Sequence, residues 1–117
     1  FLHHACGHLR ALLPRIAGLE VDMVESLSPP PTGNVEIWQA REVLPAHIGI
    51  IGGIEPVRFL TLEMNELDAY VENLLERVQR GPNGLRRYIL ANSDSCPPGV
   101  SIEKFIRVGE IARSWKL

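Results

Sequence analysis

The residues of this chain best suited to metal chemistry are one histidine and two cysteines. His4 and Cys6 stand two positions apart near the start, and Cys96 precedes a Pro-Pro-Gly segment near the end; these are the only two cysteines. A histidine and a thiolate two residues apart at a strand end can bind one metal ion, and a thiolate from another strand end would complete a three-ligand site. Such a set of nitrogen and sulfur donors favours zinc, and three protein ligands leave one position open, which is typical of a catalytic site.

Further residues bear on such a site. Glu25 stands where a second strand is expected to end, so its carboxylate is a candidate catalytic group that occupies the open zinc position until a thiol arrives. A solvent-exposed or helix-capping carboxylate is the equal alternative. Gly52 and Gly53 would let a substrate or cofactor approach the backbone closely, and tight strand-to-loop geometry explains them equally well. His3 alternates with His4 along the expected strand and is predicted to face the opposite side, toward the helices.

Four apolar segments that resemble strands must position these residues, at 1–6, 21–26, 48–51 and 88–91. Each is followed by a helical pattern, and alternation of this kind favours a parallel sheet. The predicted fold class is α/β: four β/α units forming the later half of a TIM (β/α)8 barrel, with the whole of 1–117 as one domain. A doubly wound open sheet is the alternative. Both folds gather their chemistry at the carboxyl ends of the strands, where the candidate residues fall.

The helical patterns carry their own start and stop signals. The clearest apolar stripe runs over 67–78, with Asn65 expected as its N-cap and Gly81-Pro82 as its stop. Asn34 is expected to cap the helix before the third strand, and Ser101 to cap the last helix. The third strand is expected to close at the glycine pair.

Composition excludes several classes of function. The net charge of -2 gives no electrostatic basis for binding nucleic acid or an anionic membrane. No apolar run approaches the roughly 20 residues of a membrane span, and the start does not resemble a signal peptide. Two cysteines do not make a secreted disulfide framework, so the expected location is cytoplasmic. The absence of an initiator Met, and a first segment that already reads as a buried strand, suggest a longer protein or restarted numbering.

Four segments in a fixed order carry a resemblance to a known family. They are the His-Ala-Cys-Gly at 4–7, the Pro-rich loop at 25–33, the Gly-Gly-Ile-Glu-Pro at 52–56 and the Cys-Pro-Pro-Gly at 96–99. Together they resemble the C-terminal half of the uroporphyrinogen decarboxylase superfamily. One branch of it transfers methyl groups from a corrinoid (cobalamin) on a partner protein to a small thiol such as coenzyme M. Its zinc motif is His-x-Cys with a distant Cys, which His4, Cys6 and Cys96 match.

Three functions follow as hypotheses. The resemblance implies zinc-dependent methyl transfer from a methyl-corrinoid to a thiol, with a corrinoid protein as partner. The first alternative is a metal-free decarboxylase of porphyrinogen type, whose arginine-rich substrate motif would lie upstream of this chain. The second alternative is an inactive barrel fragment. Because four parallel strands cannot close a barrel, we expect a homodimer or pairing with a missing N-terminal half.

Overall fold

The core of the protein is a sheet of four parallel strands, in a computed structural model that describes residues 1–117. The strands stand in the order of the chain: β1 (Leu2–His4), β2 (Met23–Leu27), β3 (Gly49–Ile54) and β4 (Tyr88–Asn92). All three neighbouring pairs are parallel, so the carboxyl ends of all four strands lie at the same end of the sheet. The predicted α/β class and parallel sheet are confirmed.

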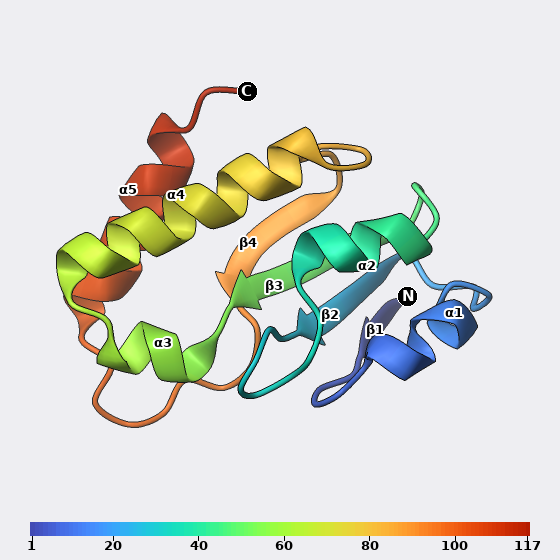
Figure 1. The fold of residues 1–117 in the computed structure, drawn as a ribbon, viewed down its shortest axis with the longest axis horizontal. Helices are drawn as coiled ribbons and strands as arrows, with labels where there is room; N and C mark the ends of the chain where they lie inside the picture. Colours follow the sequence, from blue (N-terminus) through green and yellow to red (C-terminus); the bar gives the residue numbers. More distant parts are fainter.

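Helices follow each strand and lie mainly over one face of the sheet (Figure 1). They are the short 3-10 helix η1 (Arg10–Leu12), α1 (Leu13–Ile16), α2 (Ile37–Val43), α3 (Pro56–Thr61), α4 (Met64–Arg80) and α5 (Ile102–Ser114). Figure 1 shows α2 and α4 crossing in front of the strands, and α4 packs against α5. None of these helices is both long and apolar enough to cross a lipid bilayer.

Two of the predicted helix caps are wrong. Glu36, not Asn34, caps α2, through a reciprocal capping box in which the Gln39 side chain accepts a hydrogen bond from the Glu36 N–H at 3.0 Å. Asn34 instead accepts a hydrogen bond from a backbone N–H of η1. Glu63 caps α4 by a second capping box, so Asn65 lies inside the first turn of that helix. The predicted stop at Gly81 and the predicted cap position at Ser101 are confirmed.

The third strand does not close at its glycine pair as expected. Gly52 and Gly53 are paired with Leu90 and Ala91 of β4, and the strand continues to Ile54. Their φ angles are +137° and +107°, a backbone region that side chains with a Cβ rarely adopt. Glycine therefore lets the strand remain in the ladder while its backbone bends.

The two faces of the sheet have different surroundings. Val24 and Ile50, which are register partners, are fully buried in one apolar cluster with residues of α2 and α4. His3 is the register partner of Val24, in agreement with its predicted helix-facing position. On the opposite face, Leu2 is 53% exposed and Ile89 is 50% exposed. The sheet therefore has one covered face and one apolar face with no layer against it.

Candidate functional site

His4 and Glu25 lie side by side at the carboxyl ends of β1 and β2. They are register partners, so their side chains leave the same face of the sheet. The Glu25 carboxylate contacts Nδ1 of His4 directly, on the face that no helix covers. A carboxylate bound to one ring nitrogen fixes the orientation of the ring and leaves Nε2 for another partner. Many metal-binding histidines are held in this way.

The electrostatics of this pair favour a protonated ring. The pKa of His4 is raised above its ordinary value, first by the hydrogen bond to Glu25 and then by the negative charge of that carboxylate. Asp94, on the loop after β4, adds a smaller contribution in the same direction, and desolvation opposes it. The Glu25 carboxylate therefore stabilises a proton on the His4 ring.

One chain does not gather His4, Cys6 and Cys96 into a metal site. No group of three or more His, Cys, Asp or Glu side chains is close enough together to hold a metal ion. The reason is topological: β1 and β4 are the two edges of the sheet, and three strand spacings of about 4.8 Å separate them by roughly 14 Å. The zinc assignment therefore stays a prediction, with its donors at one end of the sheet but on opposite edges.

The two cysteines also differ in environment. Both are free thiols; Cys6 is exposed, whereas Cys96 is partly buried and packs against the apolar core. Burial raises the pKa of the Cys96 thiol, so this group is protonated at neutral pH unless a cation stabilises its thiolate. Cys6 is thus the more accessible of the two sulfur atoms that follow the carboxyl ends of the strands.

Close packing against β4 and α2 accounts for Gly53. A Cβ at this position would lie 2.6 Å from the hydroxyl of Tyr88 and 3.0 Å from Cγ1 of Ile37. The Tyr88 hydroxyl is itself held in place, because it donates to the Gly52 carbonyl at 2.8 Å. Contact of Gly52 and Gly53 with a substrate or cofactor stays a prediction.

Glu55 is a fully buried carboxylate for which the sequence predicted no role. It accepts hydrogen bonds from the Thr32 hydroxyl and, at 2.8 Å, from the Arg58 N–H. It therefore caps α3 and at the same time holds the Pro-rich loop of 29–33 against the end of β3. The Glu-Pro pair at 55–56 was the available signal, because Pro56 is suited to the first position of a helix after a capping residue.

Three buried serines connect the ends of β2 and β4 and were also missed. The Ser28 hydroxyl donates to the Ser93 hydroxyl at 2.7 Å, which donates to the Ile54 carbonyl at 3.0 Å, and Ser26 donates to the Ser93 carbonyl. Ser26 directly follows Glu25, and Ser93 directly precedes Asp94. The serine cluster therefore fixes the position of the segment that carries Glu25 relative to the segment that carries Asp94, at the carboxyl ends of the strands. Its sequence signal is a run of small polar residues where apolar strands end.

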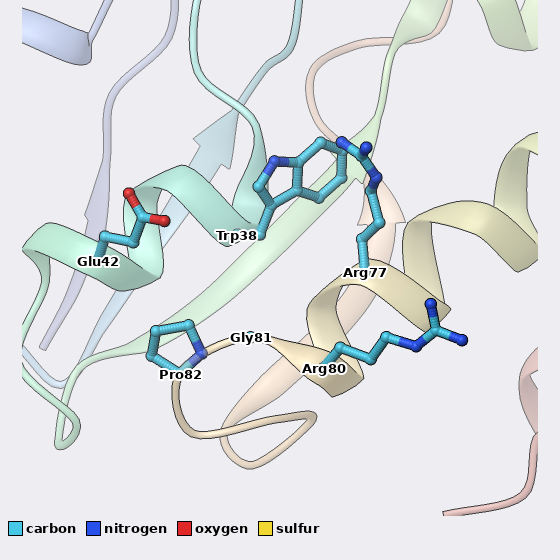
Figure 2. Close-up of a pocket in the computed structure, with 6 residues that line it drawn as sticks. All are labelled: Trp38, Glu42, Arg77, Arg80, Gly81 and Pro82. Atoms are coloured by element: carbon cyan, nitrogen blue, oxygen red, sulfur yellow. The ribbon is translucent and has the colours of Figure 1, made fainter.

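A separate groove lies on the helical layer, between α2 and the end of α4 (Figure 2). It has a volume of about 310 Å³ and is lined by Trp38, Glu42, Arg77, Arg80, Gly81 and Pro82. Figure 2 shows Arg77 beside the indole of Trp38, and its guanidinium carbon is 4.7 Å from the ring centroid. Since Gly81 and Pro82 precede β4, this groove lies toward the amino ends of the strands, whereas His4 lies at a carboxyl end. None of the predicted site residues contributes to it.

Comparison with protein-family models and with curated proteins gives no match for this chain.

Proposed function

We propose that this chain is the later half of a β/α barrel of the uroporphyrinogen decarboxylase superfamily, and that its strand ends serve zinc-dependent methyl transfer from a methyl-corrinoid to a thiol. Three features support the barrel: the strands follow one another in chain order, they are all parallel, and the helices lie mainly over one face. A barrel has the same arrangement, with the helices outside and the uncovered face inside.

The observation that carries the proposal is the contact between Glu25 and His4 on that uncovered face. In this proposal Glu25 orients the imidazole, which differs from its expected place in the open zinc position. His4 then presents Nε2, and Cys6, two residues on, supplies a thiol at the same strand end. Zinc bound there would lower the pKa of a substrate thiol, so that the thiolate forms near neutral pH.

A second candidate is a half-barrel that has no activity by itself. The uncovered apolar face and the absence of three gathered ligands in one chain favour it. Under this alternative the residues at the strand ends form a working site only after the barrel is completed.

Zinc titration of metal-free protein tests the proposal. We expect one zinc per chain in the wild type, a loss of binding in His4→Ala and Cys6→Ser, and no change in the control His3→Ala. Glu25→Gln should weaken zinc binding about 10- to 100-fold, because it removes the charge that orients the imidazole. Equal loss of zinc in His3→Ala and His4→Ala would contradict the assignment of the ligand.

Methyl transfer is then measured with methylcobalamin and a small thiol, followed by the change in cobalamin absorbance. Zinc binding together with turnover supports the methyltransferase. Zinc-free protein that does not bind added zinc, and that has no turnover, supports the inactive half-barrel.

A further inference from the structure

We propose that the groove between α2 and the end of α4 binds a small zwitterion, an α-amino acid with an apolar side chain. Arg77 would hold the carboxylate of this ligand, and Glu42 would hold its ammonium group. The lining comes from α2, from the last turn of α4 and from the two residues after that helix. Both segments lie in the interior of the chain, so the site depends neither on a strand edge nor on the proposed zinc ligands.

The first observation is that the Arg77 guanidinium has no carboxylate partner within the chain. None of the ion pairs includes it, and its guanidinium carbon lies 4.7 Å from the centroid of the Trp38 ring. A guanidinium that stacks on a ring keeps the N–H groups at its edge free for a planar anion. Because the indole already orients Arg77, binding a carboxylate there costs little further side-chain entropy.

Glu36, at the start of α2, does not neutralise Arg77 by direct contact. Its carboxylate accepts the hydrogen bond of the capping box from the Gln39 N–H. Burial raises the pKa of Glu36, and the charges of Arg58 and then Arg77 oppose that shift without forming an ion pair. Arg77 therefore keeps donors for an anion from outside the chain.

The second observation is an unpaired charge of the opposite sign in the same groove. Glu42, on the α2 side, is exposed and forms no ion pair, whereas Arg80, on the α4 side, is paired with Glu76. No nitrogen of either groove arginine lies within 4.0 Å of the Glu42 carboxylate. A groove that holds separated charges of both signs is complementary to a ligand that carries both.

The spacing of these charges suits an α-amino acid. Trp38 and Glu42 are one helical turn apart on α2, so their Cβ atoms lie about 6 Å from each other. Arg77 stacks on Trp38, and its charge is therefore offset from Glu42 by about one turn. The two charged groups of an α-amino acid lie roughly 3 Å apart, and a hydrogen bond of about 2.8 Å at each end extends their reach to roughly 8–9 Å. The offset leaves room for the charged end of such a ligand.

The rest of the groove is apolar and of suitable size. Its volume of about 310 Å³ lies at the lower end of the range for small-molecule sites. Figure 2 shows Gly81 and Pro82 below the indole of Trp38. A Cβ on Gly81 would lie 3.8 Å from Cβ of Trp38, so α2 and the end of α4 meet at the floor of the groove. An apolar ligand side chain would therefore pack between the indole and the proline ring.

Isothermal titration calorimetry of the whole chain tests the site with three probes. They are leucine, leucinamide, which lacks the carboxylate charge, and isocaproate, which has the same carbon chain without the ammonium group. We expect leucine to bind about 10- to 100-fold more tightly than either other probe, because each of them lacks one charge-assisted hydrogen bond. No binding of leucine at millimolar concentration would overturn the site. Leucine that binds no more tightly than the other two probes would overturn the zwitterion assignment.

Substitution of the two charged residues tests their assigned contacts. Arg77→Gln should lower the affinity for leucine to that for leucinamide, and Glu42→Gln should lower it to that for isocaproate. Arg15→Gln in α1 and Glu72→Gln in α4 are the matched controls, because both residues are exposed and lie outside the groove. The controls should bind leucine as the wild type does. Equal weakening in a control and its groove variant would overturn the contacts, since net charge alone would then explain the loss.

Two further titrations define the ligand and the place of the site. The dipeptide leucylglycine carries its two charges about 3.5 Å further apart than leucine does, so it should bind less tightly. Tighter binding of the dipeptide would overturn the assignment to a free amino acid. His4→Ala, which should lose zinc, should bind leucine with the affinity of the wild type. Loss of leucine binding in that variant would overturn the placement of the site in this groove, whatever the outcome for zinc.

Discussion

Gly53→Ala should destabilise the protein by about 2–5 kcal/mol. The φ of Gly53 is +107°, and holding an L-residue at such an angle costs roughly 1–2 kcal/mol. The new Cβ would lie 2.6 Å from the Tyr88 hydroxyl and 3.1 Å from Cδ2 of Leu74, and overpacking of this kind costs about 1–3 kcal/mol. The two costs arise from different causes, so we expect them to add.

Relief of the closest contact should recover only part of this loss. Tyr88→Phe removes the hydroxyl that the new Cβ would meet, but Ile37 Cγ1 remains at 3.0 Å and the positive φ is unchanged. In a double-mutant cycle we therefore expect a coupling of about 1–2 kcal/mol between Gly53→Ala and Tyr88→Phe. The strain of the backbone should persist in the double variant.

Urea unfolding followed by circular dichroism, at one fixed protein concentration, measures these changes. The matched control is Gly109→Ala in α5, where the nearest atom to the new Cβ is the flexible end of Arg113 at 3.5 Å. That change should be neutral or stabilise the protein by up to about 1 kcal/mol, because alanine is the better helix former. Gly53→Ala with the stability of the wild type would refute the packing argument and make ligand approach the remaining reason for this glycine.

Three further predictions concern buried or paired polar groups. Arg41 is 3% exposed, donates to two backbone carbonyls and leaves its Nε without a partner. Arg41→Lys should therefore lower the free energy of unfolding by about 1–3 kcal/mol, because one ammonium group cannot replace the planar guanidinium. An unchanged urea midpoint would contradict this. The hydrogen bond from Arg107 lowers the pKa of Asp68 below 3.8, so the stability that this pair contributes is present above that pH and is lost as the pH falls through the pKa of Asp68 in the folded protein. The difference in urea midpoint between wild type and Asp68→Asn should therefore shrink as the pH falls over that range. A difference that grows toward acid pH would contradict the prediction. Ser93→Ala should lower the free energy of unfolding by about 1–3 kcal/mol, because the buried Ser28 hydroxyl loses its acceptor. Thermal or urea unfolding measures this change, and a neutral effect would show that the serine cluster does not hold the strand ends.

Helix prediction succeeded where a long apolar stripe was present and failed where the signal was a side-chain pair or a short segment. The stripe over 67–78 lies within α4 because every third or fourth residue meets the core. The caps at Asn34 and Asn65 were wrong because glutamates formed capping boxes, in which each carboxylate must reach a particular N–H. The helix α3 was missed, since six residues are too few to show a period.

The extent of β3 depended on the neighbouring strand. Gly52 and Gly53 read as a strand end in isolation, because glycine has low strand propensity. In the folded chain, pairing with Leu90 and Ala91 keeps them in the ladder, and the Tyr88 hydroxyl occupies the space that a Cβ would need. Contacts between residues more than 30 positions apart therefore overrode the local preference.

Local sequence alone determined the order of the strands and the longer helices, and the end of the sheet at which the chemistry collects. Alternation of apolar strands with helical stripes implies parallel strands, and parallel strands bring His4, Cys6, Glu25, Asp94 and Cys96 to one end of the sheet. Tertiary structure decided which of these residues meet. Strand order separates β1 from β4, register sets His4 against Glu25, and core packing takes in Cys96. These outcomes depend on contacts between distant segments, and the pattern within any one segment carries no information about its neighbours in space.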